Sequence, residues 1–383
     1  MASKRKATQT ELSKAVDNER KRASVRSLDL SFNELSDMNK TGELLVSPAY
    51  QRLFRWSTAK QSQFIESVIL EMPIPQIYVI EIAEDQWELI DGLQRLSTYL
   101  HFRGELQLPG TDPEINKGDF LELVACDIVP ALNGLTFDMM TTSIQHRVKR
   151  ATLRVDVVRR ESNPRFAYHM FKRLNTGGEQ LSNQEARNCS IRLLGTKFVD
   201  FADSLVLDPA FMKCTEDITD EFRNRMGEAE LVLRFFAFKN NLGDYVHDID
   251  TFLTDYLERV TDQTSAEALP FDYVREEAVF RKTFRIISAT LEAKAFSRWV
   301  GGKYAGGFSM GHFEAFSIGI ASVIDNVPDT PDTNELEKIK NALLEAKCAP
   351  QLRELTVGGG KNFRRIYEKK IALVADRLRA IYE

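Results

Sequence analysis

The feature that most constrains the fold is a pair of strand-like runs followed at once by a helical pattern. Residues 77–82 (IYVIEI) indicate a buried strand, and residues 87–90 (WELI) indicate its hairpin partner. A helix is expected from about Leu93, because Leu96, Tyr99 and Leu100 repeat at helical spacing. This succession predicts a mixed α/β domain.

Flanking segments extend this domain in both directions. Ser57 is placed to cap a helix that runs to about Leu70 and is stopped by the prolines of residues 73–75. The alternating apolar positions of residues 153–157 predict another strand. A further helix is expected from Pro164 to about Leu174, and a helix or turn through Phe32 and Leu35.

Strand signals fade after about residue 190. Helical patterns then cover residues 222–239, 249–260, 273–291, 311–324, 335–346 and 363–382. We therefore expect an α+β protein with a mixed α/β domain over residues 29–191 and an all-helical domain over residues 192–383. Residues 1–28 are polar and basic, which predicts a flexible arm.

Composition places the chain among folded, non-membrane proteins. Its 383 residues exceed one typical domain, with 43% hydrophobic and 28% charged residues. No apolar run approaches the roughly 18 residues that a membrane span needs, and no secretory signal is visible. The four cysteines are far apart, which argues against zinc or disulfides. We expect a cytoplasmic protein with no membrane partner.

Charge gives a weaker indication about partners. The formal net charge of −5 does not favour nucleic acid for the molecule as a whole, but residues 147–173 are strongly basic. The basic residues are Arg147, Lys149, Arg150, Arg154, Arg159, Arg160, Arg165, Lys172 and Arg173. The segment forms either a phosphate-facing surface or a solvated face.

Residues 90–98 (IDGLQRLST) carry the strongest chemical signal. A strand ends, Gly92 permits a tight turn, and a helix begins whose first-turn amides favour an anion such as phosphate. Arg95 is placed to donate to phosphate oxygens, and Asp91 to orient Arg95, hold Mg²⁺ or position water. The alternative is a plain turn in which Asp91 caps the helix and Arg95 is a surface cation.

A second candidate segment is residues 171–188. Asn175 precedes paired glycines, which would bring the backbone close to a ligand. Arg187 falls near the start of the next helix. Ser182 and Glu185 have the spacing of a capping box, so a structural role is the better interpretation for Ser182.

Several motifs in fixed order carry a family resemblance. They are P-x-Y-Q-R-x-F-x-W from Pro48, P-x-P from Pro73, D-G-x-Q-R from Asp91, and F-x-x-x-N-x-x-G followed by L-S-x-x-E-x-R from Phe171. In this order they resemble the N-terminal domain of GmrSD-type modification-dependent restriction endonucleases, over roughly residues 29–190. The resemblance implies a ParB/sulfiredoxin-like fold, and nucleoside-triphosphate binding and hydrolysis that supports DNA restriction in anti-phage defence.

The resemblance also assigns residues. Catalytic roles fall to Asp91, Gln94 and Arg95. The nucleotide and phosphate contacts would come from Tyr50, Gln51, Arg52, Gly92, Ser97, Asn175, Glu185 and Arg187. The implied ligands are a nucleoside triphosphate and Mg²⁺, without a protein metal site, and the implied partners are DNA, a separate nuclease or other defence subunit, and further copies of the chain.

Two departures from the family pattern bear on activity. Leu93 stands where the family commonly has the first glutamine of D-G-Q-Q-R, which puts hydrolysis in more doubt than binding. The five histidines show no H-x-x-P or clustered metal pattern, so a C-terminal His-metal finger nuclease is not expected. If DNA is cut, either a partner or the N-terminal domain itself must cut it.

Three functions are therefore compatible with the sequence. The first is a nucleotide-dependent, triphosphate-hydrolysing component of a defence system. The second is a ParB-like DNA nuclease or nickase that uses the basic segment and Asp91. The third is a non-enzymatic adaptor with a vestigial pocket.

Residues 357–361 (VGGGK) lack the glycine and hydroxyl positions of a P-loop and indicate a loop, as do residues 301–307.

Overall fold

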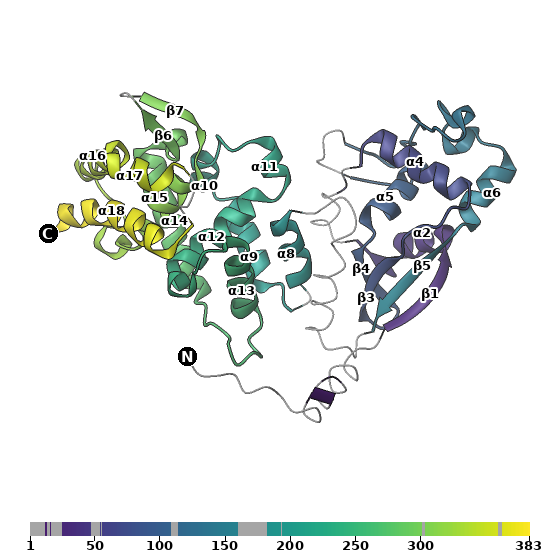
Figure 1. Ribbon diagram of the computed structural model, residues 1–383, viewed down its shortest axis with the longest axis horizontal. Helices are drawn as coiled ribbons and strands as arrows, with labels where there is room; N and C mark the ends of the chain where they lie inside the picture. The colour runs from purple at the N-terminus through teal and green to yellow at the C-terminus, as the bar shows by residue number, and fades with distance from the viewer. Residues whose placement is uncertain are drawn as a thin grey trace. The chain divides into compact units, whose positions relative to one another are not determined.

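A computed structural model describes residues 25–46, 54, 56–108, 114–159, 182–192, 194–300, 303–358 and 362–383, with residues 12, 13 and 16 of the N-terminal arm. The chain divides into two compact units, Met1–Gly178 and Glu179–Glu383, and each is described by itself (Figure 1). Most of the expected arm, residues 1–28, lies outside the described residues, and its last residues, from Val25, belong to the first named strand.

The first unit alternates strands and helices. Its elements are β1 (Val25–Ser31), α2 (Phe32–Thr41), β2 (Leu44–Leu45), α4 (Thr58–Ile69), β3 (Ile77–Ala83), β4 (Gln86–Asp91), α5 (Leu93–Phe102), the 3-10 turns η1 (Pro130–Leu132) and η2 (Phe137–Met139), α6 (Thr142–Arg150) and β5 (Thr152–Val158). The predicted hairpin, the helix capped by Ser57 and the strand at residues 153–157 are all present.

The strands form one mixed five-stranded sheet in the order β1-β5-β3-β4-β2. β1 runs antiparallel to β5, and β5 runs parallel to β3, which makes the antiparallel hairpin with β4. β2 adds a short parallel edge to β4. The neighbouring strands β3 and β5 are far apart in sequence, because β4, α5 and α6 lie between them along the chain.

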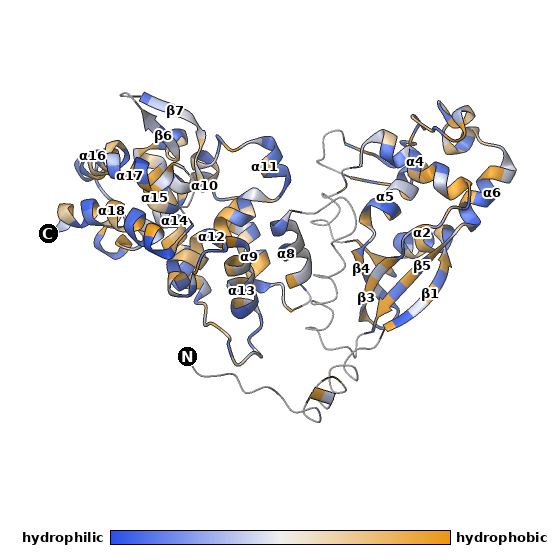
Figure 2. Cartoon of the chain, viewed as in Figure 1, coloured by the Kyte–Doolittle hydropathy of each residue, from blue (hydrophilic) through white to orange (hydrophobic). Residues whose placement is uncertain are grey.

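One face of this sheet is the core of the unit. In the parallel pair, Ile77 lies opposite Val155 and Val79 opposite Val157, and all four side chains are buried. Helix α2 lies against β1 and β2 and also contacts α5 and α6 (Figure 1), and apolar positions alternate with polar ones along the elements (Figure 2). This alternation is what a half-buried sheet requires.

The second unit is mainly helical. Its elements are α8 (Asn183–Ile191), α9 (Lys197–Val206), α10 (Pro209–Cys214), α11 (Asp220–Asn224), α12 (Gly227–Asn241), η3 (Leu242–Asp244), α13 (Ile249–Thr261), α14 (Tyr273–Thr290), η4 (Glu292–Lys294), β6 (Ser297–Val300), β7 (Lys303–Phe308), α15 (Met310–Ala321), η5 (Ile324–Asn326), α16 (Thr333–Cys348), α17 (Pro350–Thr356) and α18 (Arg364–Tyr382).

Two details of this unit correct the sequence-based expectations. The single helix expected over residues 222–239 is interrupted before Gly227, because Met226 has a left-handed backbone with φ of 59°. The second domain is also not wholly helical: β6 and β7 form an antiparallel hairpin where a loop was expected. The Trp299 and Tyr304 rings pack edge to face across it, a cross-strand contact that stabilises the pair.

A buried ion cluster crosslinks three helices of this unit. Glu314 of α15 accepts from Arg234 of α12 at 2.9 Å and is paired with Lys370 of α18, and all three residues are buried. Removing one partner from such a cluster leaves an uncompensated buried charge, which costs about 3–5 kcal/mol. The cluster therefore fixes the packing of α12, α15 and α18.

In the part of the chain that the structure describes, no helix combines the length and the apolar character that crossing a lipid bilayer requires.

His312 is a buried, neutral histidine in α15. Its ring stacks on Phe316, and its Nδ1 lies 3.1 Å from the Ser309 hydroxyl. Burial, together with the nearby positive charge of Lys347, lowers the pKa of His312 to about 3. An unfolded histidine titrates near 6.5, so the unfolded chain binds one more proton than the folded chain between these values.

We therefore predict that His312 makes folding sensitive to acid. As pH falls through about 6.5 toward 3, the free energy of unfolding should decrease by up to about 1.4 kcal/mol per pH unit from this group alone. Urea denaturation at several pH values would measure the slope, and His312→Phe should flatten it. His247→Phe, at an exposed position of the same unit, should leave the slope unchanged. Equal slopes for His312→Phe and the unmodified protein would contradict the prediction.

Candidate functional site

The turn between β4 and α5 has the conformation that the D-G-x-Q-R motif predicts. β4 ends at Asp91, Gly92 adopts a left-handed backbone with φ of +106°, and α5 begins at Leu93. A Cβ atom at residue 92 would lie 2.1 Å from Cγ2 of Ile77, in the neighbouring strand. Glycine is therefore required here both for its backbone conformation and for space.

Arg95 folds back over this turn. Its Nη2 donates to Oδ2 of Asp91 at 2.8 Å and to the carbonyl oxygen of Gln76 at 3.0 Å. The Arg95 side chain is only 16% exposed, against 30% for the Asp91 side chain. Arg95 is thus a sheltered, oriented guanidinium and not a freely solvated cation. Asp91 orients it, and no side chain caps the helix at Gly92.

One side-chain hydrogen-bond donor at the turn lacks a protein partner among the described residues. The N–H of Arg95 Nε is buried and has no hydrogen-bond acceptor. Because Gly92 supplies no side-chain cap, the start of α5 also keeps its favourable potential for an anion. A buried donor without a partner costs about 1–3 kcal/mol. An oxyanion that reached this buried donor would satisfy it.

Trp56, the last residue of the P-x-Y-Q-R-x-F-x-W motif, lies beside this turn. Its backbone N–H donates to Oε1 of Gln94 at 3.1 Å, and its carbonyl oxygen accepts from Nε2 of Gln61 at 2.7 Å. The indole Nε1 of Trp56 is buried and, like Arg95 Nε, has no acceptor among the described residues. The structure therefore brings the end of residues 48–56 beside the D-G-x-Q-R turn.

A side-chain contact between α4 and α5 supports the turn. Gln61 Oε1 lies 2.8 Å from Nδ1 of His101, and burial lowers the pKa of His101, which favours a neutral ring. Leu93 is 3% exposed, so this chain uses the position for core packing. Ser97 is also buried, one turn beyond Leu93.

The described structure does not test the other predicted site residues as parts of this turn. Tyr50, Gln51, Arg52 and Asn175 lie outside the described residues. Glu185 lies on α8, in the second unit, and its side chain is outside the described part.

Arg187 is fully engaged within the second unit. Its Nη2 pairs with Asp250 at 2.7 Å, its Nη1 donates to Gln184 at 3.0 Å, and its Nε donates to Thr254 at 3.3 Å. Its side chain is 4% exposed. The bonds to Asp250 and Thr254 join α8 to α13. A phosphate contact of Arg187 would have to compete with them.

A divalent cation would find few ligands in the protein itself. Among the described residues, no group of three or more histidine, cysteine, aspartate or glutamate side chains is arranged to hold a metal ion. Asp91 is the carboxylate at the turn. Mg²⁺ commonly binds through one carboxylate together with phosphate oxygens and water, so Asp91 fits a Mg²⁺ that arrives with a phosphate ligand.

Two contributors to the site were not found from the sequence. They are the carbonyl oxygen of Gln76, which holds Arg95, and the backbone of Trp56, which is held by Gln94 and Gln61. Main-chain groups leave no residue-type signal. For Trp56, the one indication in the sequence is that it follows Tyr50, Gln51 and Arg52 by a few residues.

Comparison with known proteins agrees with these features. Residues 32–192 match the family model described as the GmrSD restriction endonuclease N-terminal domain, which confirms the resemblance carried by the motifs. The match begins with α2 and ends just after α8. No curated protein and no solved structure matches the chain.

We predict that Gly92→Ala destabilises the first unit more than a typical substitution of glycine by alanine. Gly42 also has positive φ, +83°, but a Cβ there meets nothing within 4 Å. Gly42→Ala should therefore cost only the backbone strain of about 1 kcal/mol, whereas Gly92→Ala should cost about 3 kcal/mol or more. Urea denaturation followed by circular dichroism would compare them, and equal losses would show that Ile77 does not restrict residue 92.

Proposed function

We propose that this chain is a nucleotide-dependent component of a DNA restriction or anti-phage defence system, and that its first unit binds a nucleoside triphosphate at the turn of Asp91–Arg95. The family match over residues 32–192 supports the restriction context. The observation that carries the phosphate assignment is the Arg95 guanidinium, oriented by Asp91 and Gln76, with a buried Nε–H that has no acceptor.

We further propose that the first unit is a ParB/sulfiredoxin-like domain. A mixed five-stranded sheet with helices over one face, and a phosphate turn at the end of β4, are consistent with this fold. The proposed domain limits are an arm over residues 1–28, this domain over residues 29–191 and a helical domain over residues 192–383.

Phosphate binding at this turn follows from its donors. A phosphate oxygen at the start of α5 would accept from backbone amides and from the Arg95 Nε–H. Hydrogen bonds to charged groups contribute about 1.5–3 kcal/mol each, so each of these donors would add to the affinity for phosphate. Because Asp91 and Gln76 already fix the guanidinium, little side-chain entropy remains to be lost on binding.

The proposed roles differ among the residues. Arg95 binds the phosphate and stabilises its negative charge, and Asp91 holds Arg95 in place. Gln94 is a positioning residue, since its amide oxygen holds the backbone of Trp56. Tyr50, Gln51, Arg52, Ser97, Asn175, Glu185 and Arg187 remain proposed contributors to the nucleotide pocket.

We propose hydrolysis as the turnover reaction. Water adds to the terminal phosphorus, the bond to the bridging oxygen breaks, and the products are a nucleoside diphosphate and inorganic phosphate. Preorganised positive charge stabilises such a transition state. Mg²⁺, bound mainly through phosphate oxygens and with Asp91 as its protein ligand, would offset the remaining charge.

DNA cleavage in this proposal belongs to a separate nuclease or other defence subunit. The restriction endonuclease family name describes cutting of DNA, and the histidines of this sequence show no clustered metal-binding pattern. The nucleotide bound to the first unit would control whether this partner cuts DNA.

The test is nucleotide binding by the full-length protein and an Arg95→Ala variant. With Mg²⁺ and ATP or GTP at saturating concentration, the unmodified protein should gain several degrees in melting temperature, because a ligand at about 100 times its Kd adds about 2.7 kcal/mol of stability. Arg95→Ala should abolish the gain, and Arg26→Ala, at an exposed position on β1, should retain it. Isothermal titration calorimetry would confirm that binding, and not only stability, is lost.

Gln94→Ala separates positioning from direct contact. It should weaken binding about tenfold without abolishing it, because it releases Trp56 but leaves Arg95 in place. A nucleotide-induced shift that survives Arg95→Ala would contradict the proposed site, and so would the absence of a shift with any nucleotide.

A further inference from the structure

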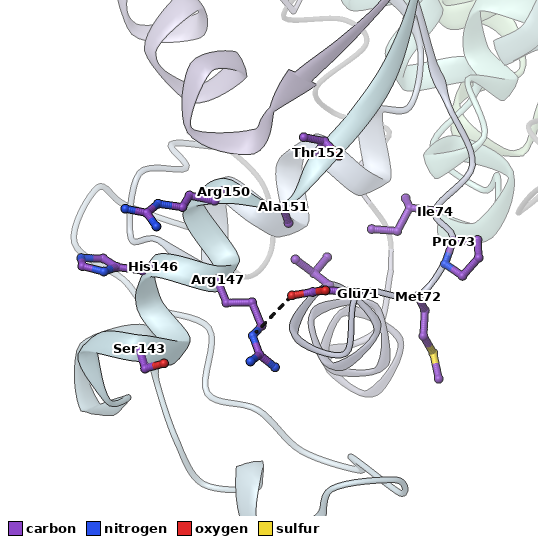
Figure 3. Close-up of a pocket in the computed structure, with 11 residues that line it drawn as sticks. Glu71, Met72, Pro73, Ile74, Ser143, His146, Arg147, Arg150, Ala151 and Thr152 are labelled. Atoms are coloured by element: carbon purple, nitrogen blue, oxygen red, sulfur yellow. Dashed lines mark ion pairs between the residues drawn. The ribbon is translucent and has the colours of Figure 1, made fainter.

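A second surface of the first unit is a groove between the end of α4 and helix α6, with a volume of about 740 Å³ (Figure 3). Its walls come from the C-terminal end of α4, the segment that follows it, and α6 with the first residues of β5. The lining residues are Val68, Glu71, Met72, Pro73, Ile74, Ser143, His146, Arg147, Arg150, Ala151 and Thr152.

The groove concentrates positive charge. Arg147 and Arg150, in the last turn of α6, line the groove. Lys149 of the same turn lies over the Phe137 ring, and Arg154 on β5 lies 3.8 Å from Asp156, so these two cations flank the groove without lining it. Cations at a helix C-terminus are stabilised by the helix dipole, by about 0.3–1 kcal/mol each. That effect accounts for their presence on α6, but not for the hollow that two of these arginines line.

One acidic side chain lines the groove and partly neutralises it. Oε1 of Glu71 lies 3.5 Å from Nε of Arg147, and the two side chains are 69% and 51% exposed. In Figure 3, Arg147 reaches from α6 toward Glu71, whereas His146 and Arg150 extend together from another side of the helix. Ion pairs as exposed as this one contribute at most about 1 kcal/mol, so a phosphate can displace Glu71 from Arg147.

The lining distinguishes among phosphate ligands. Among the described residues that line the groove, there is no phenylalanine, tyrosine or tryptophan on which a base could stack. Mononucleotide and single-strand sites commonly use such aromatic platforms. Arginines together with the hydroxyls of Ser143 and Thr152 are instead the side chains that contact the backbone of a duplex.

We propose that this groove binds the phosphodiester backbone of double-stranded DNA, with Arg147 and Arg150 as its phosphate contacts and Glu71 as a competitor for Arg147. The proposal rests on the proposed action on DNA. It does not require nucleotide binding at Arg95, so the two can fail separately.

The test measures binding of a short fluorescein-labelled DNA duplex to the full-length protein by fluorescence anisotropy, over a range of sodium chloride concentrations. The double substitution Arg147→Gln with Arg150→Gln should weaken binding at least about tenfold and lower the salt dependence of log K by about 1 for each arginine. Glu71→Gln should strengthen binding severalfold, because it frees Arg147.

Two controls separate charge from folding and from general attraction. Replacing both arginines by lysine should retain most of the affinity, since lysine also contacts phosphate as a point charge. Arg26→Gln removes one positive charge from the same unit, against two in the double variant, but Arg26 pairs in register with Val157, five residues and roughly 17 Å along β5 from Thr152. It should change the affinity by less than about threefold.

Several results would overturn the proposal. They are the absence of duplex binding at low salt, unchanged binding by the double glutamine variant, and weaker binding by Glu71→Gln. Single-stranded RNA bound more tightly than duplex DNA, with the same dependence on Arg147 and Arg150, would also overturn it. The nucleotide-induced shift of the double glutamine variant, measured in parallel, shows whether the Arg95 site stays intact.

Discussion

The Arg95 guanidinium is held against the sheet by two acceptors, the Asp91 carboxylate and the Gln76 carbonyl oxygen. This geometry depends on Gly92, because a side chain at that residue would collide with Ile77 in the adjacent strand. Sheet packing, turn conformation and cation orientation are therefore one coupled constraint. The remaining Nε–H is buried without an acceptor, a cost that a bound oxyanion would remove.

The two anion-binding surfaces proposed for the first unit differ in how firmly their arginines are held. Arg95 is 16% exposed and pairs with Asp91 at 2.8 Å, whereas Arg147 is 51% exposed and lies 3.5 Å from Glu71. Salt screens exposed charges far more than sheltered ones. Raising the ionic strength should therefore weaken nucleotide binding at Arg95 less than DNA binding at Arg147.

Local patterns in the sequence predicted much of the first unit. The 77–90 hairpin, the Ser57 cap and the turn at Gly92 depend on neighbouring residues, and the structure has all three. The parallel pairing of β3 with β5 depends on contacts between distant segments, which no local pattern encodes. Glycines interrupt the strand signal of the β6–β7 hairpin, so the sequence pattern predicts a loop there. The bond of Arg187 to Asp250 joins helices that are far apart in sequence. Tyr50, Gln51, Arg52 and Asn175 stay predictions.

The most direct measurement is an NMR spectrum of the arginine Nε–H groups of the ¹⁵N-arginine-labelled protein, recorded with and without Mg²⁺ and nucleoside triphosphate. Arg95→Lys identifies the Arg95 signal by its loss. If the buried Nε–H donates to a phosphate, this signal should move downfield and become protected from solvent exchange when nucleotide is added. A signal that does not move at saturating nucleotide would contradict phosphate binding by Arg95.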